Sequence, residues 1–246
     1  MSSLAAASAS RPNALVYRGP AACDGCPEAV AHLLRTSPSN FSVQFAGPKE
    51  DVDITRKSLS QVDVYAQPGG GDLAKTWPAM KPYNHAVRAF VRKGGRYLGF
   101  CSGAYLAGRP GFDLLPGKSD TDEESVQPGA QVTDESNTII QVDWTFSTGP
   151  DAGKTEKRWM FLQDGATIQL ENGAEDANST NIKGRFSSNG DVAATLKAFR
   201  KGWVGVVGPH PEATKDWYTP YHLHNPDGIS LDIGYDFVET TMQCKA

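Results

Sequence analysis

The sequence has few cysteines, no long apolar run and no excess of one charge. Four cysteines in 246 residues are too few for a disulfide-stapled scaffold. No stretch approaches the roughly 20 apolar residues that a membrane helix needs. A net charge of -4 and a pI near 5.7 give no basic surface for nucleic acid or anionic membrane. We therefore expect a small-molecule substrate, no nucleic-acid partner and no membrane partner, and the sequence leaves the oligomeric state open.

The length and composition are those of an ordinary soluble domain, with 39% hydrophobic residues and a mean hydropathy of -0.42. Residues 1–12 are small and polar, and we expect them to be disordered ahead of one domain over 13–246. They could be a cytosolic start, or a mature end left after removal of a signal. The sequons at Asn40 and Asn178 favour secretion over a cytoplasmic location.

Short apolar runs alternate with helical patterns and predict an α/β fold with a mostly parallel sheet flanked by helices. We expect an antiparallel β extension in the middle of the chain, where apolar and polar residues alternate over 132–147 and 157–170. Segment 192–199 reads as a short helix or a strand–turn element. The other predicted strands are 14–17, 42–46, 62–66, 96–100 and 202–207, and the predicted helices are 27–35, 83–93 and 229–242.

Residues 99–103 (GFCSG) place Cys101 between a predicted strand and a small-residue helix start. This is the setting of a nucleophile elbow, in which the two glycines let neighbouring backbone approach closely. A helix that begins at Ser102 would direct its free amides and its positive end at the sulfur, which favours the thiolate. The alternative is a buried structural cysteine in a glycine-rich turn, and the motif alone does not decide between the two.

Residues 208–212 (GPHPE) follow a strongly apolar strand and favour the functional interpretation of Cys101. The two prolines keep this segment extended, so His210 and Glu212 point to the same side. The carboxylate can then orient the imidazole, which gives a nucleophile, a base and an orienting group in the order Cys101, His210, Glu212. A solvated surface turn is the alternative.

A glycine-rich loop, Gly69, Gly70 and Gly71, follows the predicted strand 62–66. Its uncovered amides suit an oxyanion hole, with the amide of Ser102 as the second donor. The pattern of a phosphate-binding loop is absent from the sequence.

These motifs, residues 14–20, 68–72, 99–105 and 208–212, resemble the class I glutamine amidotransferase-like superfamily. Within it the chain is most similar to the N-terminal domain family of fungal biotin–protein ligase. The resemblance implies a flavodoxin-like sheet and a Cys-His-Glu triad, but it does not imply biotin ligation. Members that hydrolyse glutamine usually carry a glutamine shortly after the elbow, where this chain has residues 104–106 (AYL). We therefore do not expect glutamine to be the substrate.

Three further groups of residues have possible roles. Cys23 and Cys26 form a C-x-x-C, which could be a local disulfide, a redox pair or half of a metal site, and Cys244 is expected to be a free thiol. Trp217 and Tyr218 are candidates for the wall of a substrate pocket. His222 and His224 could join His210 around a metal, although solvated loop histidines are the commoner case.

From these observations we expect a cysteine-dependent hydrolase or amide/acyl-transfer enzyme that acts on a small polar substrate, with no cofactor and no metal. Two other functions remain open: a non-catalytic binding or regulatory domain with a vestigial triad, and a redox or carbonyl stress protein of the DJ-1-like type.

Overall fold

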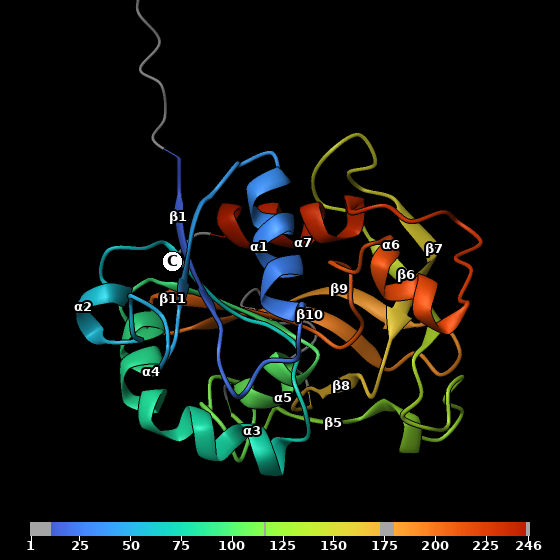
Figure 1. Ribbon diagram of the computed structural model, residues 1–246. Helices are drawn as coiled ribbons and strands as arrows, with labels where there is room; N and C mark the ends of the chain where they lie inside the picture. The colour runs from blue at the N-terminus through green and yellow to red at the C-terminus, as the bar shows by residue number, and fades with distance from the viewer. Residues whose placement is uncertain (1–10, 116, 173–179, 245–246) are drawn as a thin grey trace, which may run out of the picture.

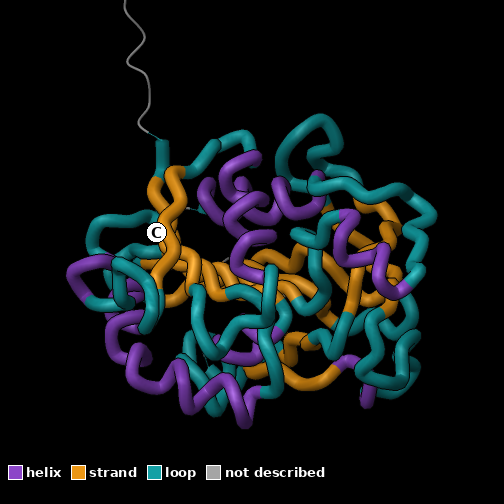
Figure 2. The backbone as a smooth tube through the Cα atoms, viewed as in Figure 1, coloured by secondary structure: helices purple, strands orange, loops and turns teal. Residues whose placement is uncertain are grey.

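The computed structural model describes residues 11–115, 117–172 and 180–244. A central nine-stranded sheet has the strand order β2-β1-β3-β4-β11-β10-β9-β6-β7, with helices above and below it (Figures 1 and 2). Its strands are β1 (Asn13–Tyr17), β2 (Ser42–Ala46), β3 (Val64–Gln67), β4 (Arg96–Phe100), β6 (Thr138–Thr145), β7 (Thr155–Leu162), β9 (Thr180–Phe186), β10 (Val192–Phe199) and β11 (Gly202–Val207). A separate small sheet pairs β5 (Asp120–Glu123) with β8 (Ala166–Gln169).

Seven α-helices are described: α1 (Cys26–Thr36), α2 (Arg56–Leu59), α3 (Leu73–Met80), α4 (Asn84–Arg92), α5 (Ser102–Ala107), α6 (Lys215–Tyr218) and α7 (Asp232–Gln243). Three short 3-10 turns, η1 (Lys81–Tyr83), η2 (Glu124–Val126) and η3 (Thr219–Tyr221), complete the described helical segments. None of the helices in the described ranges is long and apolar enough to span a bilayer.

The parallel half of the sheet is β2-β1-β3-β4-β11, which confirms the predicted α/β class. Its order is that of a doubly wound, flavodoxin-like sheet, in which ligands bind outside the carboxyl ends of the strands. The chain moves outward from β1 to β2 and then crosses to β3 on the other side of β1. The loops after β1 and β3 therefore border the crevice where the winding direction changes.

Alternate residues of each parallel strand pack into the two helical layers. In β1, Ala14 and Val16 join the core beneath α1 and α7, whereas Leu15 and Tyr17 join the core formed with α4 and α5. Figure 1 shows α1 and α7 on one side of the sheet and α2 to α5 on the other. Burial on both faces explains why these strands read as continuous apolar runs in the sequence.

The antiparallel half consists of β10, β9, β6 and β7. The alternation in the middle of the chain predicts β6 and β7, whereas β9 was not predicted. Segment 192–199, for which the sequence allows a helix or a strand, is strand β10. Segment 157–170 differs from expectation, because it breaks after Leu162 and its second part leaves the main sheet as β8. The break is a tight turn in which Asp164 has a φ of 47°.

The first twelve residues are only partly described. Residues 1–10, predicted to be disordered, lie outside the described residues, as does the sequon at Asn178. Arg11 is described, and its guanidinium donates to the side-chain oxygen of Asn40 at 2.8 Å and to the carbonyl of Phe41 at 3.0 Å.

A buried ion pair joins the antiparallel half to α7. The ammonium of Lys183 lies 2.7 Å from a carboxylate oxygen of Asp236, and both side chains are almost fully buried. Asp236 also accepts hydrogen bonds from the indole of Trp144 at 2.9 Å and from the amides of Ser147 and Thr148 at 2.8 and 2.7 Å. Burial opposes ionisation of Asp236, but the hydrogen bond and charge of Lys183 outweigh it and lower the pKa of the carboxyl. This stabilisation is therefore present above the ordinary pKa of about 3.9 and is lost as pH falls through the lowered value.

We predict that Asp236→Asn lowers the free energy of unfolding by about 3 kcal/mol, because it leaves the Lys183 ammonium buried without its counterion. Guanidinium unfolding of both proteins at pH 7 measures this difference. Adding Lys183→Met to Asp236→Asn should restore part of the stability, since the unpaired charge is then removed. A double variant less stable than Asp236→Asn alone would contradict this account.

Candidate active site

Cys101 lies directly after β4, at the start of α5, in a sharply turned backbone. Its φ of 49° and ψ of -111° are unusual for a residue with a side chain, and such backbone occurs where the surrounding structure holds it in place. A methyl group on Gly99 would overlap the carbonyl of Gly103, and one on Gly103 would overlap the carbonyl of Gln67. The two glycines therefore have the close-approach role expected of a nucleophile elbow.

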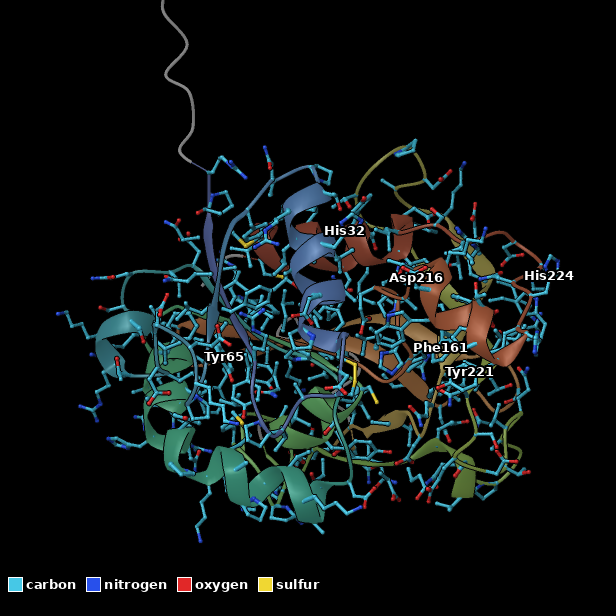
Figure 3. All side chains as sticks on the ribbon, in the orientation of Figure 1. His32, Tyr65, Phe161, Asp216, Tyr221 and His224 are labelled. Carbon is cyan, nitrogen blue, oxygen red and sulfur yellow. A yellow bond between two sulfur atoms is a disulfide. The ribbon has the colours of Figure 1, made fainter. Side chains whose placement is uncertain are left out.

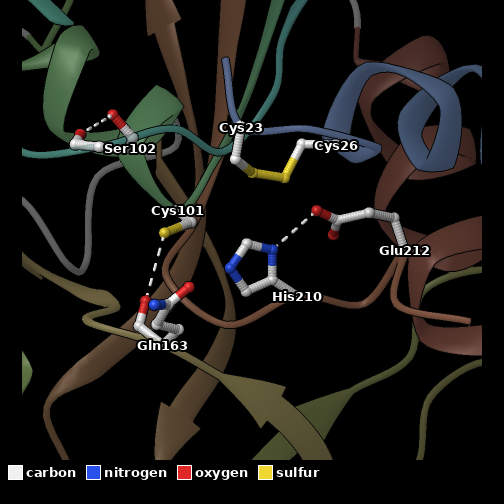
Figure 4. Close-up of a disulfide and its surroundings, with 8 residues drawn as sticks. Cys23, Cys26, Cys101, Ser102, Gln163, His210 and Glu212 are labelled. Atoms are coloured by element: carbon white, nitrogen blue, oxygen red, sulfur yellow. Dashed lines mark hydrogen bonds and ion pairs between the residues drawn. A yellow bond between two sulfur atoms is a disulfide. The ribbon is translucent and has the colours of Figure 1, made fainter. Parts of the chain in front are cut away.

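His210 and Glu212 lie in the loop after β11 and point toward each other (Figure 4). Nδ1 of His210 is 2.9 Å from Oε1 of Glu212, and both side chains are buried. The amide of His210 donates to the carbonyl of Phe161 at 2.9 Å, so the end of β7 holds the histidine backbone. The rings of Phe161 and Trp217 pack on the imidazole, with ring centroids at 5.9 and 4.9 Å.

The charge state of His210 depends on its two neighbours. Burial by itself would lower the pKa of the imidazole, but the charges and hydrogen bonds of Cys101 and Glu212 outweigh burial and raise the pKa to about 10. The thiol of Cys101 donates a hydrogen bond to the carbonyl of Gln163 at 3.5 Å. The two neighbours thus favour the protonated form of His210.

The glycine loop after β3 lies against both residues. A Cβ on Gly69 would be 3.0 Å from Cε1 of His210 and 3.6 Å from the Cβ of Cys101, so this position has no room to spare. A Cβ on Gly70 would overlap the carbonyl of Ala21, whereas one on Gly71 would meet nothing within 4 Å. The hydroxyl of Ser102 donates to the carbonyl of Gly71 at 3.0 Å and ties the glycine loop to the start of α5.

Cys23, in the loop after β1, and Cys26, the first residue of α1, form a disulfide, which is the first of the three alternatives that the sequence left open. The amide of Cys23 donates to the carbonyl of Gly69 at 3.0 Å, and the sulfur of Cys26 would be 3.6 Å from a Cβ on Gly69. Figure 4 shows the disulfide beside Cys101 and His210. The bridge therefore supports the loop that touches both of these residues.

A cavity of about 430 Å³ opens at Cys101. Of the residues proposed from the sequence for an oxyanion hole or pocket, Gly70, Gly71 and Ser102 line it. Gly69 does not line the cavity and packs against His210 and Cys101. Trp217 and Tyr218 are also absent from the lining and pack instead on Phe161, with ring centroids at 5.5 and 5.4 Å.

The remaining cysteine and the two other loop histidines lie apart from this cavity. Cys244 follows α7 as a free thiol. Figure 3 shows His224 at the periphery of the molecule, away from Phe161, the ring that contacts His210. Within residues 11–115, 117–172 and 180–244, no group of three or more His, Cys, Asp and Glu side chains is arranged to hold a metal ion.

Sequence reasoning did not identify one wall of the cavity. This wall comprises Thr121, Asp122 and Glu123 of β5, Glu135, and the turn formed by Gln163 and Asp164. The Asp164-Gly165 pair is a turn signal that could have divided segment 157–170 at the right place. No local pattern marks β5, because its residues are polar and pair only with β8.

Comparison with known proteins identifies the fold. Residues 12–112, which include Cys101 but not His210, match the family model for the N-terminal part of biotin-protein ligase. A glutamine amidotransferase from Thermotoga maritima superposes with a TM-score of 0.61 at 12% identity, over 96% of this chain and 100% of that one. A protein described as a candidate GMP synthase subunit, from Thermoplasma acidophilum, gives a TM-score of 0.57 at 13% identity, over 96% of each chain. A search of curated protein sequences finds no significant match. The predicted resemblance and the predicted fold class are thus confirmed, while identities this low establish the fold alone.

We predict that the imidazole of His210 titrates near pH 10 rather than near its ordinary value of about 6.5. Because the folded-state pKa is raised, the stabilisation from this group is complete below about pH 6.5 and is lost as pH rises through about 10. NMR titration of the imidazole resonances measures the value. In Cys101→Ala the pKa should fall, since the charge and hydrogen bond of Cys101 are removed. A wild-type value at or below 6.5 would contradict the proposed ion pair.

We also predict that Gly69→Ala disturbs His210, whereas Gly71→Ala does not. The new methyl group at position 69 would press on the imidazole, and the one at position 71 would extend into open space. NMR titration of the His210 imidazole in the two variants measures this difference. An unchanged His210 titration in folded Gly69→Ala would show that the contact is not tight.

Proposed function

We propose that this protein, whose fold is that of the class I glutamine amidotransferase-like proteins, is a cysteine-dependent hydrolase or acyl-transfer enzyme that acts on a small polar substrate. The observation that carries the proposal is the position of Cys101. Cys101 has the turned backbone of an elbow, it lies next to the His210–Glu212 pair, and it lines a cavity. A cysteine that served only to fill the core would need none of these three features.

In the proposed reaction, the thiolate of Cys101 attacks the carbonyl carbon of an amide or ester. The oxygen of the tetrahedral intermediate would be stabilised by the amide of Ser102 and an amide of the glycine loop. Helix α5 leaves the Ser102 amide without an intrahelical partner, because Ser102 is its first residue. His210 lies beside Cys101 but outside the cavity lining. In the proposed step it gives its proton to the leaving group, and a thioester on Cys101 remains.

Water or another acceptor resolves the thioester. Neutral His210 removes a proton from the incoming nucleophile, which attacks the thioester carbon and expels the Cys101 thiolate. Glu212 is the orienting group, since it fixes Nδ1 of the imidazole and leaves Nε2 for proton transfer. Phe161 holds the same histidine through its carbonyl, so the imidazole needs no reorganisation between the two steps.

Glutamine is not the substrate that we propose. The chain has Ala104 and Tyr105 where glutamine-hydrolysing members usually carry a glutamine, and Tyr105 lines the cavity. The phenol of Tyr105 donates to the carbonyl of Asp164 at 3.3 Å. A bulky ring thus occupies the wall where the family's amide side chain would be expected.

We predict that iodoacetamide at pH 7 labels Cys101 at least about tenfold faster than Cys244 in the folded protein. Cys101 lies at the start of α5 beside His210, whereas burial raises the pKa of the Cys244 thiol. Peptide mass spectrometry over time measures both rates. The matched variant His210→Gln should slow the labelling of Cys101 and leave Cys244 unchanged.

Acyl transfer can be tested directly with the wild-type protein and His210→Gln. Incubation with p-nitrophenyl acetate should add one acetyl group to Cys101, and this adduct should persist longer in His210→Gln, where the base for deacylation is missing. Rapid alkylation of Cys101 without any acyl adduct would favour the redox alternative. Failure of both reactions would favour a binding domain with a vestigial triad.

A further inference from the structure

The cavity beside Cys101 is lined by carboxylates. Five acidic residues contribute to its wall: Asp72, Asp122, Glu123, Glu135 and Asp164. Among the described residues, no lysine, arginine or histidine side chain lines it. The acidic residues come from different parts of the fold: the start of α3, strand β5, the loop before β6 and the turn between β7 and β8. Folding thus brings them together at the thiol.

Most of this negative charge has no counterion among the residues that the structure describes. The ion pairs of the described residues include Asp72, which lies 2.9 Å from the ammonium of Lys75, and none of the other four carboxylates. Asp122 accepts a hydrogen bond from the neutral amide of Gln169 at 3.0 Å, and Glu123 accepts one from the hydroxyl of Ser125. Neutral donors satisfy lone pairs but do not cancel the charge.

The carboxylates are close enough to affect one another. Burial raises the pKa of Asp164 to about 6, and the charges of Glu123, Glu135 and Asp72 add to the increase. At neutral pH the wall therefore retains several negative charges that repel one another. A bound cation would relieve this repulsion, whereas a bound anion would increase it.

We infer that the substrate is a cationic amide or ester, in which an ammonium or guanidinium group contacts the carboxylate wall while the carbonyl reaches Cys101. This inference rests on the proposed function, in which the substrate reacts at Cys101 inside the cavity. The carboxylates then give the cavity its preference for a positively charged substrate. Cys101 is only 5% exposed and lines this same cavity. A small molecule that reaches the sulfur must therefore pass the carboxylates.

Thiol-reactive probes of equal chemistry and opposite charge test the inference without knowledge of the substrate. The cationic trimethylammonium-ethyl and the anionic sulfonato-ethyl methanethiosulfonates both transfer a thioalkyl group to a thiolate. In a Cys244→Ser background, Cys101 is the free thiol, because Cys23 and Cys26 are joined. Each rate is divided by the rate with 2-mercaptoethanol, which removes the intrinsic difference between the reagents.

We expect the normalised rate for the cationic reagent to exceed that for the anionic reagent at least about tenfold at low ionic strength. The ratio should approach one in about 1 M salt, where the Debye length is about 3 Å. Glu135→Gln and Asp122→Asn should each reduce the ratio. Asp51→Asn removes the same charge from an exposed loop outside the cavity, and it should leave the ratio unchanged.

Neutral methyl methanethiosulfonate separates the two possible failures. Rapid labelling of Cys101 by this reagent, combined with a charge ratio of one, would overturn the cationic substrate and leave the proposed function standing. The inference would also be overturned if the ratio fell as much in Asp51→Asn as in Glu135→Gln, since the preference would then belong to the net charge of the protein. Slow labelling of Cys101 by the neutral reagent would contradict the proposed function itself, and the inference would fall with it.

Discussion

The turned backbone at Cys101 is the constraint on which the rest of the site depends. A residue with a side chain at a φ of 49° costs on the order of 1–3 kcal/mol, and the surrounding structure must supply that free energy. Strand β4 lies between β3 and β11, and the amide of Cys101 continues its ladder by donating to the carbonyl of Val207 at 2.9 Å. The elbow is therefore anchored in the centre of the sheet, where the backbone has little freedom to relax.

The elbow also determines what can lie next to it. Because Gly103 is in contact with the carbonyl of Gln67, the end of β3 and the start of α5 approach closely, and the glycine loop follows at once. Gly69 in turn touches His210, and its carbonyl receives the amide of Cys23 from the disulfide loop. Three segments from the ends of β1, β3 and β11 thus converge on one thiol, as expected at the carboxyl edge of a doubly wound sheet.

Much of this arrangement could be predicted from the sequence, because its determinants are local. Apolar runs identify the parallel strands, paired glycines identify the elbow, and two prolines keep His210 and Glu212 on one side of the chain. The wall of the cavity could not be predicted in the same way. Strand β5 is polar and short, and it forms only through its partner β8, which the sequence places more than 40 residues away. Trp217 was assigned to the pocket from its position in the sequence, whereas its ring packs on the imidazole of His210.

The two halves of the fold make different contributions to the site. The parallel half supplies Cys101, the glycine loop and the loop that carries His210 and Glu212, whose geometry is tied to the central strands. The antiparallel half and the small β5–β8 sheet supply the turn at Asp164 and most carboxylates of the wall. None of these carboxylates belongs to β4 or to its neighbours β3 and β11, the strands that hold Cys101. The thiol and the carboxylate wall therefore depend on different parts of the fold, as in other α/β folds where variable loops are held by a rigid sheet.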